Sequence, residues 1–407
     1  MIDLLKLVII LGATIYLLMR KWDLGLVLLL DAVLVAILFW YGPLPLVTSI
    51  LYGIIATDTL KLAGAVFLVL MLAELLRRTQ SIEKMVASLQ IVIPDSRVVI
   101  ALLPTMIGLM PMLGGAMFSA PMVNEIGSRL KLSAERKTFL NYWFRHSMEY
   151  IFPLYSSLLM IATLVGVSIY DFIAVSYPLT FAALAGGILW GLWGVRKHDV
   201  PDHDGAKSKA WRDLLSSTWP LLLTILAVVV LKVEMLISLV AIILLVLLVK
   251  RIGPAHWLDV VKRSFPPRTF SAIFGVMIFK RVLEDAGAVE RIPAALSALG
   301  LPPLLVAFVV PFIAGLLTGT ASAAIALSVP LVLPLLTPLS IDPITAGLWM
   351  FASGFSGILL SPLHLCLALT REYFDANWRR LYQALVPAAG LIIAVALGIV
   401  TWRMRPL

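Results

Sequence analysis

The sequence predicts an all-helical integral membrane protein of about ten transmembrane helices and two re-entrant hairpins, arranged as two inverted-topology repeats. Its composition, its series of long apolar runs and a correspondence between its two halves support this prediction. Of the 407 residues, 61% are hydrophobic and 14% are charged, and the mean hydropathy is +1.01. Soluble domains have about 45–50% apolar and about 25% charged residues. The chain therefore has too little polar surface to face water on all sides.

The apolar runs are long enough, or nearly so, to cross the roughly 30 Å hydrocarbon layer of a bilayer. Five precede the middle of the chain, at residues 4–19, 24–41, 60–76, 137–165 and 172–195. Five follow it, at residues 217–231, 235–249, 269–283, 344–369 and 381–402. The one long polar stretch, from Arg196 to Asp213, is rich in Pro, Gly, Asp and Lys and indicates a solvated linker. We therefore divide the chain into a first repeat (1–195), a linker (196–215) and a second repeat (216–407).

Two further apolar segments are interrupted near their middle and are predicted to be re-entrant hairpins. The first, 98–130, is broken at MPMLGG, and the second, 301–339, is broken at LTGTAS. Each arm is shorter than a full membrane span. A hairpin enters and leaves the membrane on the same face and adds no crossing. Each half therefore has five crossings, one for each of its five apolar runs. An odd number of crossings inverts the second half relative to the first.

The basic residues predict the orientation of the chain. If the N-terminus lies outside, most of the Lys and Arg residues fall on the cytoplasmic side, as the positive-inside rule requires; among them are Arg78, Lys84, Lys250 and Arg251. We therefore expect a multi-pass protein of the cell (inner) membrane with both termini outside and the linker in the cytoplasm. Basic residues in cytoplasmic loops explain the net charge of +9 more simply than binding to nucleic acid does.

The two halves share an ordered set of residues when one is shifted along the other. At an offset of 207, Pro104 meets Pro311 and Gly108 meets Gly315; at an offset of 209, the matches are Ser119 with Ser328, Pro121 with Pro330, Ser147 with Ser356, Pro153 with Pro362 and Pro178 with Pro387. An inverted repeat is the architecture with which many secondary transporters build two alternating-access states. This correspondence is the strongest functional signal in the sequence.

The binding site of such transporters lies near the midplane, where broken helices offer free backbone groups to a polar ligand. The hairpin tips and the residues just beyond them are the first candidates: Gly114, Gly115, Ser119, Asn124, Thr318, Gly319, Thr320 and Ser322. Helix N-termini at these tips would attract an anion. The alternative is that these small residues only permit close helix packing.

Each hairpin is followed by a long helix, 137–165 or 344–369, that contains a proline, and we expect both helices to be broken. The first carries Arg145, His146 and Glu149 deep in the span, where an uncompensated charge costs at least about 2.5–3.5 kcal/mol. One interpretation is an ion pair between Arg145 and Glu149, which are four residues apart. The other is that Arg145 binds a substrate carboxylate or phosphate while Glu149 or His146 carries a coupling proton.

Other polar residues of these two helices are weaker candidates for the site: Ser356, and with less weight Tyr155, Ser156, Ser157, Ser353 and His364.

The single cysteine, Cys366, lies in an apolar stretch without metal-ligand spacing and is expected to serve packing. Asp31, in the middle of a span, is expected to have a structural hydrogen bond or pairing role. No resident metal or cofactor is predicted, apart from a coupling Na⁺ at the hairpin tips or a coupling H⁺.

The order of scaffold helices, hairpin and broken helix, occurring twice, resembles the ion transporter superfamily. The segments MPMLGGAMFSAPMVNEIG, NYWFRHSMEYIFP and LLTGTASAAIALSVP more closely resemble the membrane-protein family known as domain of unknown function 401 (DUF401). The resemblance implies an elevator-type carrier, in which hairpins and broken helices move against a scaffold, and a homodimer. The Ser-Asn-Thr pattern of sodium-coupled dicarboxylate symporters is absent from the tips, which leaves sodium coupling open.

We therefore expect a secondary active transporter of a small organic anion, coupled to protons or sodium. The alternative is a carrier or flippase for an anionic lipid-linked substrate, because a hairpin tip with Arg145 suits a phosphate headgroup equally well. A membrane-embedded enzyme is less favoured, since the sequence has no HExxH, no paired intramembrane aspartates and no nucleotide-binding loop. A channel would need a continuous pore, whereas inverted halves favour alternating access.

Overall fold

The computed structural model describes residues 2–109, 115–196, 207–253, 257–289, 291, 300–336, 339 and 341–404, and within these ranges the chain forms helices and no strands. The helices of the first half are α1 (Ile2–Met19), α2 (Leu24–Leu38), α3 (Pro43–Ile55), α4 (Thr57–Arg78), α5 (Ser81–Val92), α6 (Ser96–Gly108), α7 (Gly115–Arg129), α8 (Ala134–His146), α9 (Ser156–Leu164) and α10 (Ile169–Gly186). A π-helical turn, η1 (Gly187–Leu192), extends α10.

The second half is also built of helices. Its elements are α11 (Lys207–Ile225) with its π-helical extension η2 (Leu226–Val230), α12 (Met235–Val249), α13 (Trp257–Arg263), α14 (Pro267–Asp285), α16 (Pro303–Thr318), α17 (Ala321–Leu336), α18 (Pro343–Leu359), α19 (Leu365–Phe374) and α20 (Trp378–Arg403). Each apolar run of the sequence coincides with one of these helices or with a pair of them.

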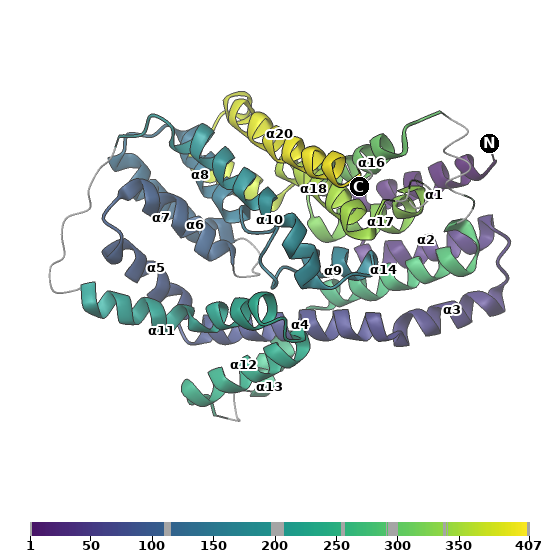
Figure 1. The fold of residues 1–407 in the computed structure, drawn as a ribbon, viewed down its shortest axis with the longest axis horizontal. Coiled ribbons are helices and arrows are strands. Elements are labelled where there is room, and N and C mark those ends of the chain that lie inside the picture. Colours follow the sequence, from purple (N-terminus) through teal and green to yellow (C-terminus); the bar gives the residue numbers. More distant parts are fainter. Residues whose placement is uncertain are drawn as a thin grey trace.

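The helices lie in two groups joined by a central layer (Figure 1). Helices α1, α2, α3 and α14 gather at the end that holds the N-terminus, and α5, α6, α7 and α11 lie at the other end. Between them run α8, α10, α18 and α20. Helix α14 of the second half packs on α2 and α3 of the first, and α10 packs on α20. The two halves are therefore interleaved rather than placed side by side.

The contact between α2 and α14 depends on small residues. Asp23 caps α2 by accepting a hydrogen bond from the amide of Gly25 and also accepts one from Ser271 Oγ at 2.7 Å. A Cβ atom on Gly25 would lie 2.2 Å from the backbone of Ser271, and one on Gly275 would lie 2.8 Å from the carbonyl oxygen of Gly25. The absence of side chains at both glycines lets the two helices approach backbone to backbone.

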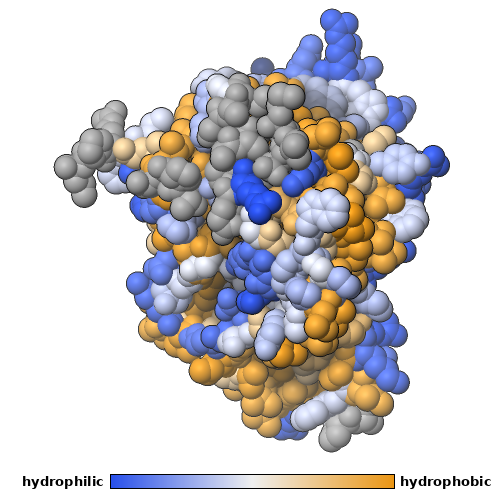
Figure 2. Space-filling model, turned by 90° about the vertical axis from the view of Figure 1, so that its right-hand side faces the viewer, coloured by the Kyte–Doolittle hydropathy of each residue, from blue (hydrophilic) through white to orange (hydrophobic). Residues whose placement is uncertain are grey.

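The exposed surface has the apolar character of a membrane protein. Within the described residues, four helices or helix pairs are long and apolar enough to cross a bilayer, 57–78, 169–192, 207–230 and 378–403, and shorter apolar helices accompany them. On α12, Ile237, Val240, Leu244 and Leu248 are all exposed and follow one helix face. Hydrophobic residues also cover large parts of the face drawn in Figure 2. The fold is thus that of a helical membrane protein.

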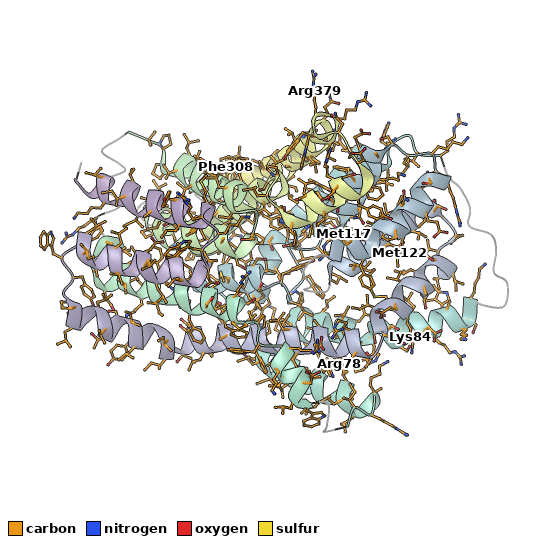
Figure 3. All side chains as sticks on the ribbon, turned by 180° about the vertical axis from the view of Figure 1, so that it is seen from behind. Arg78, Lys84, Met117, Met122, Phe308 and Arg379 are labelled. Carbon is orange, nitrogen blue, oxygen red and sulfur yellow. The ribbon has the colours of Figure 1, made fainter. Side chains whose placement is uncertain are left out.

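Basic residues gather at one group of helix ends. Arg78 and Lys84, at the end of α4 and in α5, line a groove together with Lys250 and Arg251, which follow α12 (Figure 3). All four are among the residues that the orientation prediction places in the cytoplasm. Arg78 also pairs with Asp259 of α13, and this contact holds the pKa of the aspartate below its usual range.

Corresponding helices of the two halves begin at a constant spacing. Helices α8 and α18 start at Ala134 and Pro343, α9 and α19 at Ser156 and Leu365, and α10 and α20 at Ile169 and Trp378, each pair 209 residues apart. The side-chain N-caps keep this spacing: Ser133 and Asp342 cap α8 and α18, and Ser168 and Asn377 cap α10 and α20. The offset read from the sequence therefore also relates local structures.

The buried aspartate of α2 has the kind of partner that its position requires. Asp31 is 1% exposed, and its carboxylate accepts a hydrogen bond of 2.7 Å from the hydroxyl of Thr14 on α1. A buried polar group without such a partner would be costly. The predicted structural hydrogen bond of Asp31 is confirmed.

Candidate functional site

The helix that follows the first hairpin is interrupted in the middle. Helix α8 ends at His146 and α9 begins at Ser156. Between them the backbone forms turns with hydrogen bonds three residues apart, such as Glu149 N to the carbonyl of His146 at 3.3 Å. Pro153, the residue from which the sequence predicts a break, lies within this segment.

The helix that follows the second hairpin has a shorter interruption. Helix α18 ends at Leu359 and α19 begins at Leu365, with Pro362 between them. Ser361 anchors this segment to the second hairpin, because its hydroxyl donates to the carbonyl of Leu316 on α16 at 2.6 Å. Each interruption removes regular helical hydrogen bonds in a buried region, where turns, side chains or ligands must satisfy the backbone groups instead.

The two interruptions meet each other. Tyr142, on the last turns of α8, donates to the carbonyl of Leu359 at the end of α18 at 3.2 Å. The Nε2 atoms of His146 and His364 are 3.2 Å apart, although the residues are separated by more than 200 positions in the sequence. The rings of these histidines and of Tyr142 pack together with centroid distances of 4.9–5.6 Å. The candidate site is therefore formed jointly by the two halves.

The partner of Glu149 differs from the sequence-based interpretation. Its carboxylate lies 2.6 Å from Nδ1 of His146, and both side chains are buried, with exposures of 8% and 7%. The predicted pairing with Arg145 assumes a continuous helix, in which residues four apart share a face. Because α8 ends at His146, Glu149 lies in a turn beyond the helix and approaches the histidine instead.

Arg145 connects the interrupted helix to the first hairpin. Its side chain is 6% exposed, and its guanidinium lies so close to the start of α7 that a Cβ atom on Gly115 would be 2.4 Å from Nη1. Its carbonyl oxygen would lie 2.1 Å from a Cβ atom on Gly108, the last residue of α6. Tyr155 adds a further link by donating to the carbonyl of Gly108 at 2.5 Å. A buried positive charge thus stands at the N-terminal end of α7.

The second hairpin contacts the same cluster through its tip. Gly319 ends α16 with a φ of +64°, a conformation that residues with a side chain rarely adopt. Its carbonyl oxygen is 2.6 Å from Nδ1 of His364, the residue that precedes α19. The tip of the second hairpin and the second interruption are therefore held together by His364.

The remaining predicted residues have other surroundings. Ser119 and Ser356 are fully buried and donate to carbonyls of their own helices, those of Ala116 and Ala352. The hydroxyls of Thr318 and Ser353 bond to backbone carbonyls, and Thr320 is exposed. Asn124 accepts a hydrogen bond from Lys137 at 2.7 Å. Ser322 is partly buried near the start of α17, and Gly114 lies outside the described residues.

Two groups in the cluster carried little or no weight in the sequence analysis. Cys366 lies in the first turn of α19, and its Sγ atom is within 4.8 Å of one ring nitrogen from each of His146 and His364. Asn141, one turn before Arg145, donates to the carbonyl of Ala116, yet its own Oδ1 is buried without a hydrogen-bond partner. The proximity of Cys366 to two histidines could not be read from spacing, because His146 comes from the other half.

The composition, the apolar helices and the buried polar cluster define this chain as an all-helical membrane protein. A family model described as "Protein of unknown function (DUF401)" matches residues 3–403, and the chain belongs to this family. The resemblance noted from three sequence segments is thereby confirmed. A comparison with curated proteins gives no match.

Proposed function

We propose that this protein is a secondary active transporter that moves a small organic anion across the membrane by an elevator-type alternating-access mechanism, coupled to protons or sodium. One observation carries the proposal: two interrupted helices, one from each half, meet at their interruptions beside the buried guanidinium of Arg145. Interrupted helices that meet inside a membrane protein are typical of transporter binding sites. In this proposal the protein is a carrier and not an enzyme.

The proposed inverted repeat is supported by equivalent contacts in the two halves. The end of α6 approaches α8 where Gly108 faces the carbonyl of Arg145, and α16 approaches α18 where Gly315 faces the carbonyl of Gly354. The glycines are 207 residues apart and their carbonyl partners 209 apart, as in the sequence alignment of the halves. Both close approaches have a Cβ-to-oxygen distance of 2.1 Å. In the proposal, two copies of one hairpin-and-helix unit form the transport domain.

The proposed anionic substrate follows from the charge at the first hairpin. The guanidinium of Arg145 adjoins Gly115, the first described residue of α7. The N-terminal end of a helix carries amides without intrahelical partners. Helix amides and an arginine fork both favour carboxylate and phosphate groups. Ser119, Asn124, Thr318, Thr320, Ser322 and Ser356 remain proposed contributors to substrate or ion binding as the transport domain moves.

The remaining parts of the proposal concern the surroundings of the site. Helices α2, α3 and α14, which pack closely on one another, are proposed to belong to the scaffold against which the hairpins move. We also propose that the protein is a homodimer in the cell (inner) membrane, with its termini outside and its linker in the cytoplasm. The groove of Arg78, Lys84, Lys250 and Arg251 supports this orientation, because cytoplasmic ends carry an excess of basic residues.

Thermal stabilisation of the purified protein tests the proposed substrate class. We expect one or more anions from a panel of carboxylates, sugar acids and phosphates to raise the unfolding temperature, because a ligand that binds only the folded state stabilises it. Measurements with and without sodium, and at two pH values, identify the coupling ion. Stabilisation by anionic lipids alone would contradict the small-solute proposal and favour the lipid carrier.

Gly115→Ala links this stabilisation to the hairpin. The new methyl group would overlap the end of the Arg145 side chain, which can move, so we expect the unfolding free energy to change by about 1 kcal/mol or less. The displaced guanidinium should nevertheless weaken the stabilisation by the anion. Gly12→Ala is the matched control, since no atom lies within 4 Å of its Cβ position. Full anion stabilisation in Gly115→Ala would contradict the placement of the substrate beside Arg145.

A further inference from the structure

The two histidines of the cluster face each other through their Nε2 atoms. Nδ1 of His364 faces the carbonyl oxygen of Gly319, and Nδ1 of His146 faces the carboxylate of Glu149, both at 2.6 Å. A carbonyl or carboxylate oxygen only accepts hydrogen bonds, so each Nδ1 carries the proton. The two Nε2 atoms lie 3.2 Å apart, so they can share a proton or bind one metal ion together.

The separation of the two nitrogens fits a shared metal ion. Zinc binds imidazole nitrogen at about 2.0–2.1 Å in tetrahedral geometry, which places two nitrogen ligands about 3.3 Å apart. The Sγ atom of Cys366 completes a group of three ligand atoms that all lie within 4.8 Å of one another. Two imidazoles and a thiolate are ligands that zinc prefers. The three ligands come from the end of α8, the residue before α19 and the first turn of α19.

The surroundings of the histidines are those of metal ligands. A histidine that binds a metal through one nitrogen usually donates its other N–H to a carboxylate or a backbone carbonyl, which fixes the orientation of the ring. His146 has the carboxylate and His364 has the carbonyl. Tyr142 packs against both rings, at centroid distances of 5.0 and 5.6 Å. The second layer of a metal site is therefore in place.

We infer that His146, His364 and Cys366 bind a Zn²⁺ ion that joins the two halves of the protein. The thiol loses its proton to solvent on binding, and the charges of the thiolate and of Glu149 balance the two charges of the ion. Three protein ligands leave a fourth position for water or an anion. The metal site does not rest on the proposed transport function, since its evidence is the geometry of the three ligands alone.

Metal binding to the full chain, purified in detergent without a polyhistidine tag, tests the inference. We expect about one zinc ion per chain by equilibrium dialysis and elemental analysis. Cobalt in place of zinc should give a thiolate-to-cobalt charge-transfer band in the near ultraviolet. Cys366 is the only cysteine in the sequence, so this band reports on that residue alone. Even if the variants fail to fold, the cobalt spectrum of the wild-type protein decides the question.

Substitutions assign the ligands one by one. Cys366→Ser should abolish the charge-transfer band, and His364→Gln should weaken zinc binding at least about 100-fold, because loss of even a second-layer partner costs about 10–100-fold. Arg129→Ala, at an exposed residue in the last turn of α7, is the control and should bind zinc like the wild type. The inference would be overturned if the wild-type protein bound zinc no better than a His364→Gln, Cys366→Ser double variant, or if its cobalt complex lacked the thiolate band. The contact between the two rings would then be a shared proton.

Discussion

Arg145→Ala is expected to reduce the affinity for the stabilising anion at least about 30-fold. The guanidinium is buried at the start of α7, so a carboxylate or phosphate there would meet it away from water. Truncating one member of a buried charged pair costs about 2–5 kcal/mol, much of it because the other charge stays buried without its partner. Arg145→Lys retains the charge but loses the planar fork, and we expect it to recover only part of the affinity.

Anion titrations followed by the unfolding temperature measure this effect. Arg129→Ala is the matched control. Arg129 lies in the last turn of α7, the helix whose start adjoins Arg145; it is exposed and pairs with Glu125 at 2.6 Å. Its loss should leave anion binding within about twofold of the wild type, because exposed ion pairs contribute little. If Arg145→Ala and Arg129→Ala bind the anion equally well, the guanidinium of Arg145 is not the anion-binding group.

Gly108→Ala and Gly315→Ala are expected to destabilise the protein by similar amounts, about 3 kcal/mol each. In both, the added Cβ atom would lie 2.1 Å from a backbone carbonyl oxygen, that of Arg145 or that of Gly354. A backbone atom cannot rotate away as a side chain can, so a hairpin arm must separate from the interrupted helix. Because the two glycines occupy equivalent positions of the proposed repeat, equal losses are expected.

Thermal unfolding of the two variants in one detergent measures both losses. Gly390→Ala is the control, since a Cβ atom there meets nothing within 4 Å and an alanine favours the helix. We expect Gly390→Ala to unfold at or above the wild-type temperature. A large loss in one hairpin variant with none in the other would show that the two close approaches are not equivalent.

Much of the helix arrangement along the chain could be predicted from the sequence, because the signals are local. The breakers at the hairpin tips and the prolines at 153 and 362 interrupt apolar runs, and helices end near each of them. The spacing of 209 also extends to the caps Ser133 and Asp342, which belong to no motif by themselves. Periodicity and breakers suffice where a helix boundary depends on the residues around it.

The candidate site was harder to predict because its contacts join distant parts of the chain. Arg145, His146 and Glu149 were recognisable as charges inside an apolar run, but the partner of Glu149 depends on where α8 ends. Cys366 looked like a packing residue, since its neighbours in sequence are apolar. Only the meeting of the two interruptions brings it next to His146. Local patterns cannot show which buried groups of two interleaved halves will meet.

Counterflow in proteoliposomes tests the central claim, that the protein is an alternating-access carrier of a small anion. The stabilising anion would be loaded inside the vesicles without label and supplied outside with label. A carrier with one site that alternates between the two sides predicts faster uptake of label when unlabelled anion is inside, and Arg145→Ala should abolish this acceleration. Uptake that the internal anion does not accelerate would contradict the account, because a continuous pore gives that result.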